Sequence, residues 1–185
     1  RLEMGQTLYV WLLCACLLFW LMGVHNRLMR LRARALAILS ALEKQVLSGI
    51  LPVQHRLVAS PADTSNNASD EYRAEWLKAL RLMEEVWAAP RRDRLDMDAQ
   101  QQRTESWAKL MTAWSAWVSA PPDLAGPCVP DSFRLEWEAS TAKAIVISDA
   151  LNAILKDYNE GVSEPPACWV AHFFGFKVSA LIGIK

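Results

Sequence analysis

Hydrophobic and polar residues occupy distinct blocks along this chain, and the first block is an uncharged run. Residues 7–24, TLYVWLLCACLLFWLMGV, contain no acidic or basic side chain. As a helix rising about 1.5 Å per residue, the run is about 27 Å long, close to the hydrocarbon thickness of a bilayer. Tyr9 and Trp11 lie towards one end, and Phe19 and Trp20 towards the other, as at the two water interfaces of membrane helices. The pattern predicts a membrane-spanning helix.

Two other structures fit an apolar run near an N-terminus: a buried helix of a soluble protein and a cleaved signal peptide. The length and purity of the run favour a membrane span over a buried helix. No small-x-small cleavage site follows it, and although LCAC at residues 13–16 is similar to a lipoprotein site, the run continues well past Cys16. We therefore expect an uncleaved membrane anchor.

Beyond the span, apolar residues recur every three or four positions, which is the spacing of one helix face. The first such stripe has coiled-coil character and consists of Leu28, Leu31, Ala35, Ile38, Leu42 and Val46. No helix-breaking residue separates it from the span, so both are predicted to form one long helix. Gly49 and Pro52 predict a kink, after which a short helix could continue to about Val58.

Three further stripes follow, separated by polar or proline-rich segments. They comprise Tyr72, Trp76, Leu80, Met83 and Trp87; then Trp107, Leu110, Met111, Trp114, Trp117 and Val118; then Trp137, Ala144, Ile147, Leu151, Ile154, Tyr158 and Val162. Residues 59–70 and 121–130 read as loops, with Asp131 as the N-cap of the last long helix. The pattern predicts an all-α fold, in which the transmembrane helix continues into an antiparallel bundle of about four helices.

Three parts of the chain follow from this reading. Residues 1–24 form a short N-terminal tail and the transmembrane helix, residues 25–177 form the bundle domain, and residues 178–185 form a C-terminal tail. Nine tryptophans are many for 185 residues. Because most fall on the helical stripes, we expect them in the core.

The charges indicate a membrane orientation and argue against nucleic acid. Net charge is zero, so no general attraction to nucleic acid is expected. Directly after the span come four arginines, whereas only Arg1, offset by Glu3, precedes it. The positive-inside rule then predicts a cytoplasmic bundle. The same arginines are candidate contacts for lipid headgroups: Arg27, Arg30, Arg32 and Arg34.

Motifs for chemistry are absent from the sequence. There is no glycine-rich phosphate loop, no G-x-S-x-G turn and no H-E-x-x-H helix. The cysteines have no zinc-ligand spacing, and we expect free thiols, with a Cys128–Cys168 disulfide as the alternative in an oxidising compartment. No catalytic residue, metal ligand or cofactor is predicted.

The two ends of the helical region carry a sequence resemblance. Near the C-terminus the pattern N-x(5)-YN is followed by a proline and by FFGF. Its residues are Asn152, Tyr158, Asn159, Pro166, Phe173, Phe174, Gly175 and Phe176. Near the N-terminus a single span precedes Asn26, Leu28, Leu31, Leu51, Pro52, Leu57 and Val58. In these positions the chain resembles the LemA family, as a divergent member in which His25 stands where a tyrosine is usual.

The resemblance implies a single-pass protein of the bacterial plasma membrane with a long first helix, and it implies no catalytic residues. The aromatic segment 169–176 would then pack as a cap on the bundle, with contact to the membrane interface as the other hypothesis.

Two functions fit the sequence. The first is a non-enzymatic, membrane-anchored interaction module that binds the bilayer through its N-terminal helix and presents a helical face to a protein partner or to the membrane. The second is a membrane-associated enzyme or accessory subunit with a site between helices. That alternative needs inward-facing polar groups gathered in one cavity, such as Glu43, Asp149, Asn152 and Tyr158.

Overall fold

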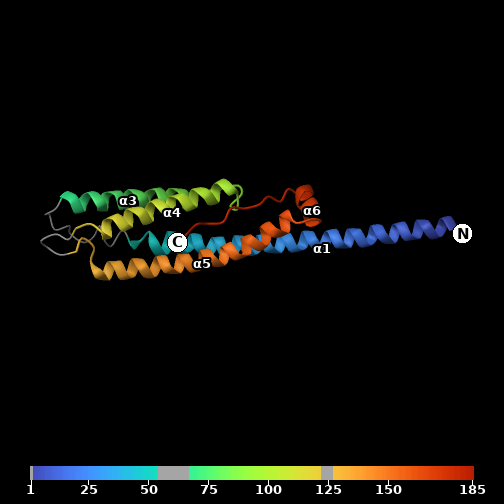
Figure 1. The fold of residues 1–185 in the computed structure, drawn as a ribbon, viewed down its shortest axis with the longest axis horizontal. Helices are drawn as coiled ribbons and strands as arrows, with labels where there is room; N and C mark the ends of the chain where they lie inside the picture. Colours follow the sequence, from blue (N-terminus) through green and yellow to red (C-terminus); the bar gives the residue numbers. More distant parts are fainter. Residues whose placement is uncertain (1, 54–66, 122–126) are drawn as a thin grey trace.

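The structure, a computed structural model, describes residues 2–53, 67–121 and 127–185. It is 81% helical, with five α-helices and no strand in these described ranges. The helices are α1 Leu2–Gln45, α3 Asn67–Ala88, α4 Met97–Val118, α5 Asp131–Ser163 and α6 Ala167–Phe174, and the π-helix η1 Val46–Ile50 extends α1 (Figure 1). The predicted all-α bundle is confirmed.

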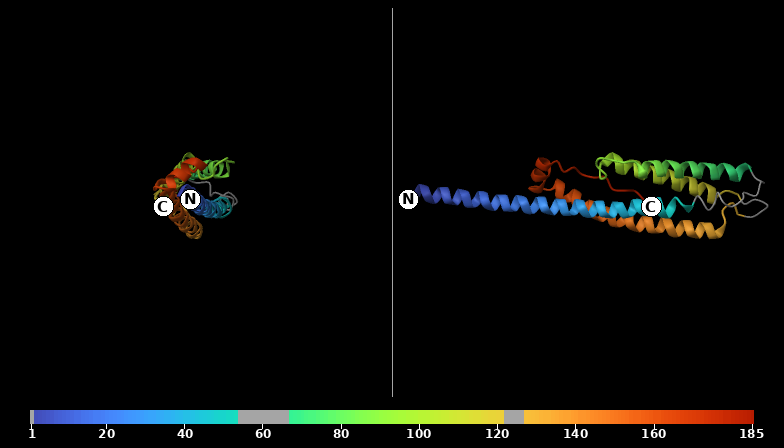
Figure 2. Two further views of the ribbon diagram at one scale, coloured as in Figure 1. Left: turned by 90° about the vertical axis from the view of Figure 1, so that its right-hand side faces the viewer. Right: turned by 180° about the vertical axis from the view of Figure 1, so that it is seen from behind.

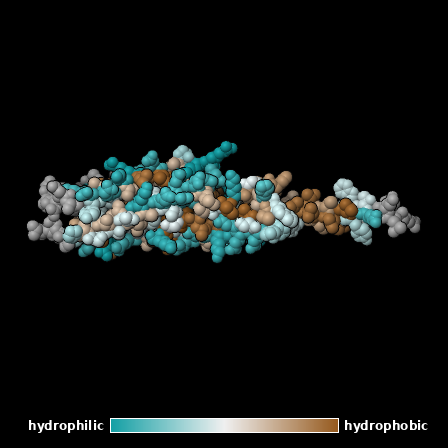
Figure 3. Space-filling model, turned by 45° about the horizontal axis from the view of Figure 1, so that its top comes forward, coloured by the Kyte–Doolittle hydropathy of each residue, from teal (hydrophilic) through white to brown (hydrophobic). Residues whose placement is uncertain are grey.

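Helix α1 joins the apolar run to the bundle without a break. It is 44 residues long, and its N-terminal part projects from the bundle as a single helix (Figure 1). Brown, hydrophobic atoms gather on this projecting part, whereas teal dominates the surface of the bundle (Figure 3). Helix α1 is long and apolar enough to span a membrane, and nothing else in the described chain buries its most apolar stretch.

The four long helices run alternately up and down (Figures 1 and 2). Helix α1 packs mainly against α5, and α3 packs mainly against α4. The two pairs meet over a core of buried aromatic and aliphatic side chains from all four helices.

Tryptophans concentrate in one part of that core. Trp76 lies 5.2 Å from Trp117 and 5.3 Å from Trp137 between ring centroids, and Trp114 lies 5.0 Å from Trp137. Such tilted and edge-on ring pairs stabilise a core beyond the area they bury. Six of the nine tryptophans are buried, as expected, whereas Trp11, Trp20 and Trp169 are exposed.

The predicted kink coincides with the π-helix. At η1 the Leu51 N–H donates to the Val46 carbonyl, five residues earlier, at 3.2 Å. This π-type hydrogen bond widens the helical turn beside Gly49. Residues 54–58, over which the short helix is predicted to reach Val58, lie outside the described residues, as do residues 59–66 of the predicted loop.

Three helix starts differ from the sequence prediction. Helix α3 begins at Asn67, inside the segment 59–70 that the sequence predicts as a loop. Helix α5 begins at Asp131 itself, with Pro130 as N-cap, so Asp131 lies in the first turn and is not the N-cap. An acidic residue in the first turn is still favourable, because the N-terminus is the positive end of the helix dipole. Helix α4 begins at Met97, ten residues before Trp107, because the polar segment between them contains several helix-forming residues, among them three consecutive glutamines.

The last helix, α6, ends at Gly175, which has a left-handed φ of 71°. The Phe176 N–H donates to the Ala171 carbonyl at 2.8 Å and the Gly175 N–H to the His172 carbonyl at 3.3 Å, a Schellman motif that reverses the chain. The remaining residues run back along the bundle and end near its middle (Figures 1 and 2). Segment 178–185, expected as a tail, thereby buries Ser179, Ile182 and Ile184.

Candidate functional site

Three of the residues that carry the family resemblance hold the C-terminal segment. The Asn152 Nδ2 donates to the Ile182 carbonyl at 2.8 Å, and its Oδ1 accepts from the Ile182 N–H at 2.8 Å. Asn159 does the same with Ser179, at 2.7 and 2.9 Å. Each side-chain amide therefore acts like the backbone of a neighbouring β-strand. Because the two asparagines are seven residues apart on α5, they lie on one helix face.

The same segment is held from its other side by α4 and the loop before it. The Ser179 hydroxyl donates to the Leu95 carbonyl at 2.6 Å, and the Gly183 N–H donates to Thr104 Oγ1 at 3.0 Å. The segment thus ties α5 to α4, which belong to different helix pairs. This part of the predicted motif has an internal structural role.

Tyr158, the third of these residues, lies where the segment begins. Its hydroxyl donates to the Lys177 carbonyl at 3.0 Å, and its ring is buried. Burial raises the pKa of Tyr158, the nearby Arg32 opposes this, and Asp93 adds to it. Arg32 itself pairs with Asp93 at 3.0 Å. Burial lowers the pKa of Arg32, but its contacts with Asp93 and Tyr158 outweigh burial and leave that pKa raised.

A buried charge cluster lies farther along α4, and sequence reasoning missed it. Arg103 is only 1% exposed; it donates to Glu43 Oε1 at 2.8 Å and to the Arg94 carbonyl at 2.8 Å. Arg94 binds the other oxygen of Glu43. Burial lowers the pKa of Arg103, and Glu43 counteracts that shift. One signal could have found Arg103: it lies four residues before Trp107 and seven before Leu110, on the apolar stripe.

The four arginines after the span differ in their surroundings. Arg27, Arg30 and Arg34 are exposed, whereas Arg32 is partly buried by its pairing with Asp93. Three of the four candidate headgroup contacts are therefore free to face a membrane surface. Asn26 and Pro166, also part of the resemblance, are exposed.

Of the phenylalanines in the FFGF motif, one packs on the bundle and two are exposed. Phe176 packs on the small core cluster formed by Leu28, Tyr158, Val162 and Ala171, whereas Phe173 and Phe174 are exposed. Gly175 provides the turn between them. The segment does cap one end of the bundle, but its largest side chains face outward.

The residues named for a site between helices have separate partners. Glu43 binds two arginines, Asn152 and Tyr158 bind the C-terminal segment, and Asp149 is exposed. Among the residues whose placement is described, no three His, Cys, Asp or Glu side chains are grouped as metal ligands. All four cysteines are free thiols. A cavity of about 500 Å³ lies between α6 and the start of α4; Arg32, Asp96, His172 and Lys177 are among its lining residues.

Comparisons of the chain with protein-family models, with curated proteins and with solved structures find no match.

Proposed function

We propose that this chain is a membrane-anchored, non-enzymatic interaction module whose helical bundle is held rigidly at the membrane surface. One observation carries the proposal: α1 is a single helix, apolar and unburied over residues 7–24 and part of the bundle core from Leu28 onwards. Water would solvate this long apolar surface poorly, and a bilayer covers it.

The continuity of α1 has a mechanical consequence. No loop separates the span from the bundle, so the bundle cannot swing freely as it would on a flexible linker. Surfaces of the bundle are then presented at fixed heights above the membrane, which suits a scaffold or docking protein. Exposed apolar residues such as Leu135 and Val146 on α5 lie far from the span and are candidates for contact with a protein partner.

Arginine placement supports a cytoplasmic bundle, because the positive charges follow the span. The resemblance to the LemA family supports the bacterial plasma membrane as the location. The enzyme alternative is less well supported, since Glu43, Asn152 and Tyr158 use their polar atoms in holding the bundle together.

Membrane extraction and a topology reporter test the proposal. We expect the full chain to stay in the membrane pellet at alkaline pH, and a variant lacking residues 1–24 to become soluble while keeping its helical circular dichroism spectrum. Of two reporters fused after Lys185, the one that is active only in the cytoplasm should be active, and the one that is active only outside it should not. Release of the full chain by alkali would contradict anchoring, and activity of an external reporter would contradict the orientation.

A further inference from the structure

Helix α6 presents three large aromatic side chains to its surroundings. Trp169 is 73% exposed, Phe173 83% and Phe174 51%; these three residues are called the aromatic surface below. Trp169 and Phe173 are four residues apart and so share one side of the helix. The rings of Phe173 and Phe174 meet edge-on with centroids 5.2 Å apart. Grouped aromatic residues that face solvent mark an interaction surface rather than ordinary surface composition.

The opposite side of α6 fixes its position. Val170 and Ala171 are buried, and Ala171 packs with Leu28 of α1 and with Tyr158 and Val162 of α5. The residues of the aromatic surface are therefore not core residues that failed to pack. They lie on the outward side of a helix that is already packed on the bundle.

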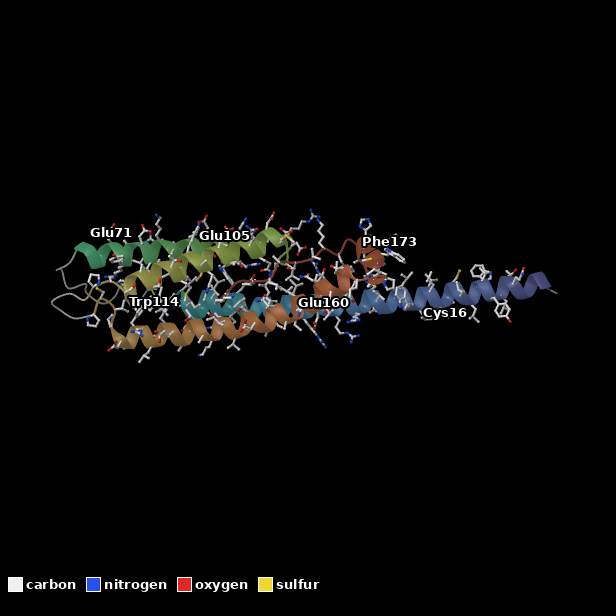
Figure 4. All side chains as sticks on the ribbon, in the orientation of Figure 1. Cys16, Glu71, Glu105, Trp114, Glu160 and Phe173 are labelled. Atoms are coloured by element: carbon white, nitrogen blue, oxygen red, sulfur yellow. The ribbon has the colours of Figure 1, made fainter. Side chains whose placement is uncertain are left out.

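The aromatic surface lies at the end of the uncharged run. The ring of His25, the first residue after that run, is 4.3 Å from the ring of Phe174 and 5.7 Å from that of Phe176. Figure 4 places Phe173 at the end of the bundle from which α1 projects, with Cys16 farther out along the projecting helix. A bilayer that covers residues 7–24 therefore reaches its interface at the level of α6.

Trp and Phe side chains favour this interface, because an aromatic ring can bury its apolar face beside the acyl chains. Charges near α6 have both signs. Arg27 lines a hollow of about 300 Å³ together with Trp20, Glu160 and Glu164. Aromatic burial rather than net charge would then provide the contact, so it should not require anionic lipid.

We propose that the aromatic surface inserts into the interface of the same bilayer that holds α1 and forms a second membrane contact. This rests on the proposed function, since it requires α1 to be in the membrane. Two contacts, one on α1 and one beside it, limit the tilt of the bundle and determine which of its sides faces the membrane. A protein partner or a second copy would have to reach the aromatic surface at the depth of the lipid headgroups.

Depth measurements on the full chain in phosphatidylcholine vesicles test this. Spin labels are placed one at a time in a chain whose four cysteines are replaced by alanine. The sites are F173C on the aromatic surface, L13C in the apolar run and V146C on the exposed side of α5. Relaxation by oxygen, which partitions into lipid, is compared with relaxation by a polar nickel chelate. Near-ultraviolet circular dichroism of the buried tryptophans checks that each variant is folded.

We expect the oxygen-to-nickel ratio at residue 173 to lie several-fold above that at residue 146 and below that at residue 13. Adding Trp169→Glu to the F173C chain should lower the ratio at 173 towards the value at 146, and high salt should not. A ratio at 173 equal to that at 146, with residue 13 in lipid, overturns the second contact but keeps the anchor. A water-exposed label at 13 overturns both. Protection of 173 from both reagents overturns the lipid contact in favour of a protein that covers the surface.

Discussion

The side chain of Asn159 pairs with the backbone of Ser179 as a strand of a sheet would. It donates to the carbonyl at 2.7 Å and accepts from the N–H at 2.9 Å. Asn152 repeats the arrangement with Ile182 two helical turns earlier. In a protein whose described residues form no strand, two asparagines thus satisfy the backbone of an extended segment that passes through the core.

Replacing Asn159 by alanine should destabilise the bundle. Ser179 is buried, so its N–H and carbonyl would lose their partners without gaining water. We expect a loss of about 1–3 kcal/mol in the free energy of unfolding, measured by urea unfolding of the full chain in detergent. Asn26→Ala, the same change at an exposed position, is the control. Equal stability of the two variants would mean that the segment does not depend on the amide.

Glu43→Gln should have a larger effect. It removes the carboxylate charge that compensates Arg103, whose side chain is almost fully buried. Arg94 adds a second positive charge to the same site. Breaking a buried ion pair from one side costs about 3–5 kcal/mol. The double variant Glu43→Leu/Arg103→Met should recover much of that loss, because the charge of Arg103 is removed with its partner and Arg94, whose side chain is 36% exposed, stays hydrated.

The matched control for Glu43→Gln is Glu138→Gln on α5. Glu138 pairs with Arg134 at 2.9 Å, and both side chains are half exposed. Loss of this ion pair should lower the free energy of unfolding by less than about 0.5 kcal/mol. If urea unfolding gives similarly small losses for both glutamates, the folded state does not depend on Glu43 to compensate the charge of Arg103.

The helices could be predicted because their signal is local. Trp76, Leu80, Met83 and Trp87 repeat at helical spacing, and all four are buried in α3. In the charge cluster, the place of Arg103 on the apolar stripe indicates only that this residue faces inward, and no local signal identifies its partner. Glu43 and Arg103 are 60 residues apart in the sequence, and only the tertiary fold brings their side chains into contact.

The C-terminal segment could not be predicted for a related reason. Ser179, Ile182 and Ile184 follow no helical period, and the apolar residues among them are too few to define an element. The sequence marks Asn152 and Asn159 through the family resemblance, and Asn152 also as a candidate inward-facing polar group, but neither observation predicts that they bind the C-terminal segment. Their role requires knowing that the chain turns back at Gly175 and passes beside α5.

Tyr158 should make stability fall at high pH. Burial raises its pKa above the ordinary value of about 10, so the folded state holds the phenol proton more tightly than the unfolded state does. The proton is bound in both states below that value, and its stabilising effect is lost as pH rises towards the folded-state pKa. Deprotonation also removes the donor to the Lys177 carbonyl.

Tyr158→Phe isolates this effect. Near neutral pH the variant should be less stable than the parent by roughly 0.5–1.5 kcal/mol, the value of one hydrogen bond. The difference should shrink as pH is raised above about 10, followed by urea unfolding of both proteins at each pH. Tyr72→Phe makes the same chemical change at an exposed site. A difference between parent and Tyr158→Phe that stays constant with pH would show that Tyr158 does not titrate in this range.

Gly175→Ala tests whether backbone conformation at this one residue sets the course of the C-terminal segment. An added Cβ would meet nothing within 4 Å, so any effect must come from the φ of 71°. We expect a loss of about 1 kcal/mol in the free energy of unfolding, and a smaller loss for Gly175→Asn because asparagine tolerates the left-handed region. Gly23→Ala, equally free of contacts but within α1, should be neutral or stabilising. If Gly175→Ala behaves like Gly23→Ala, the Schellman turn does not fix the path by which residues 176–185 enter the core.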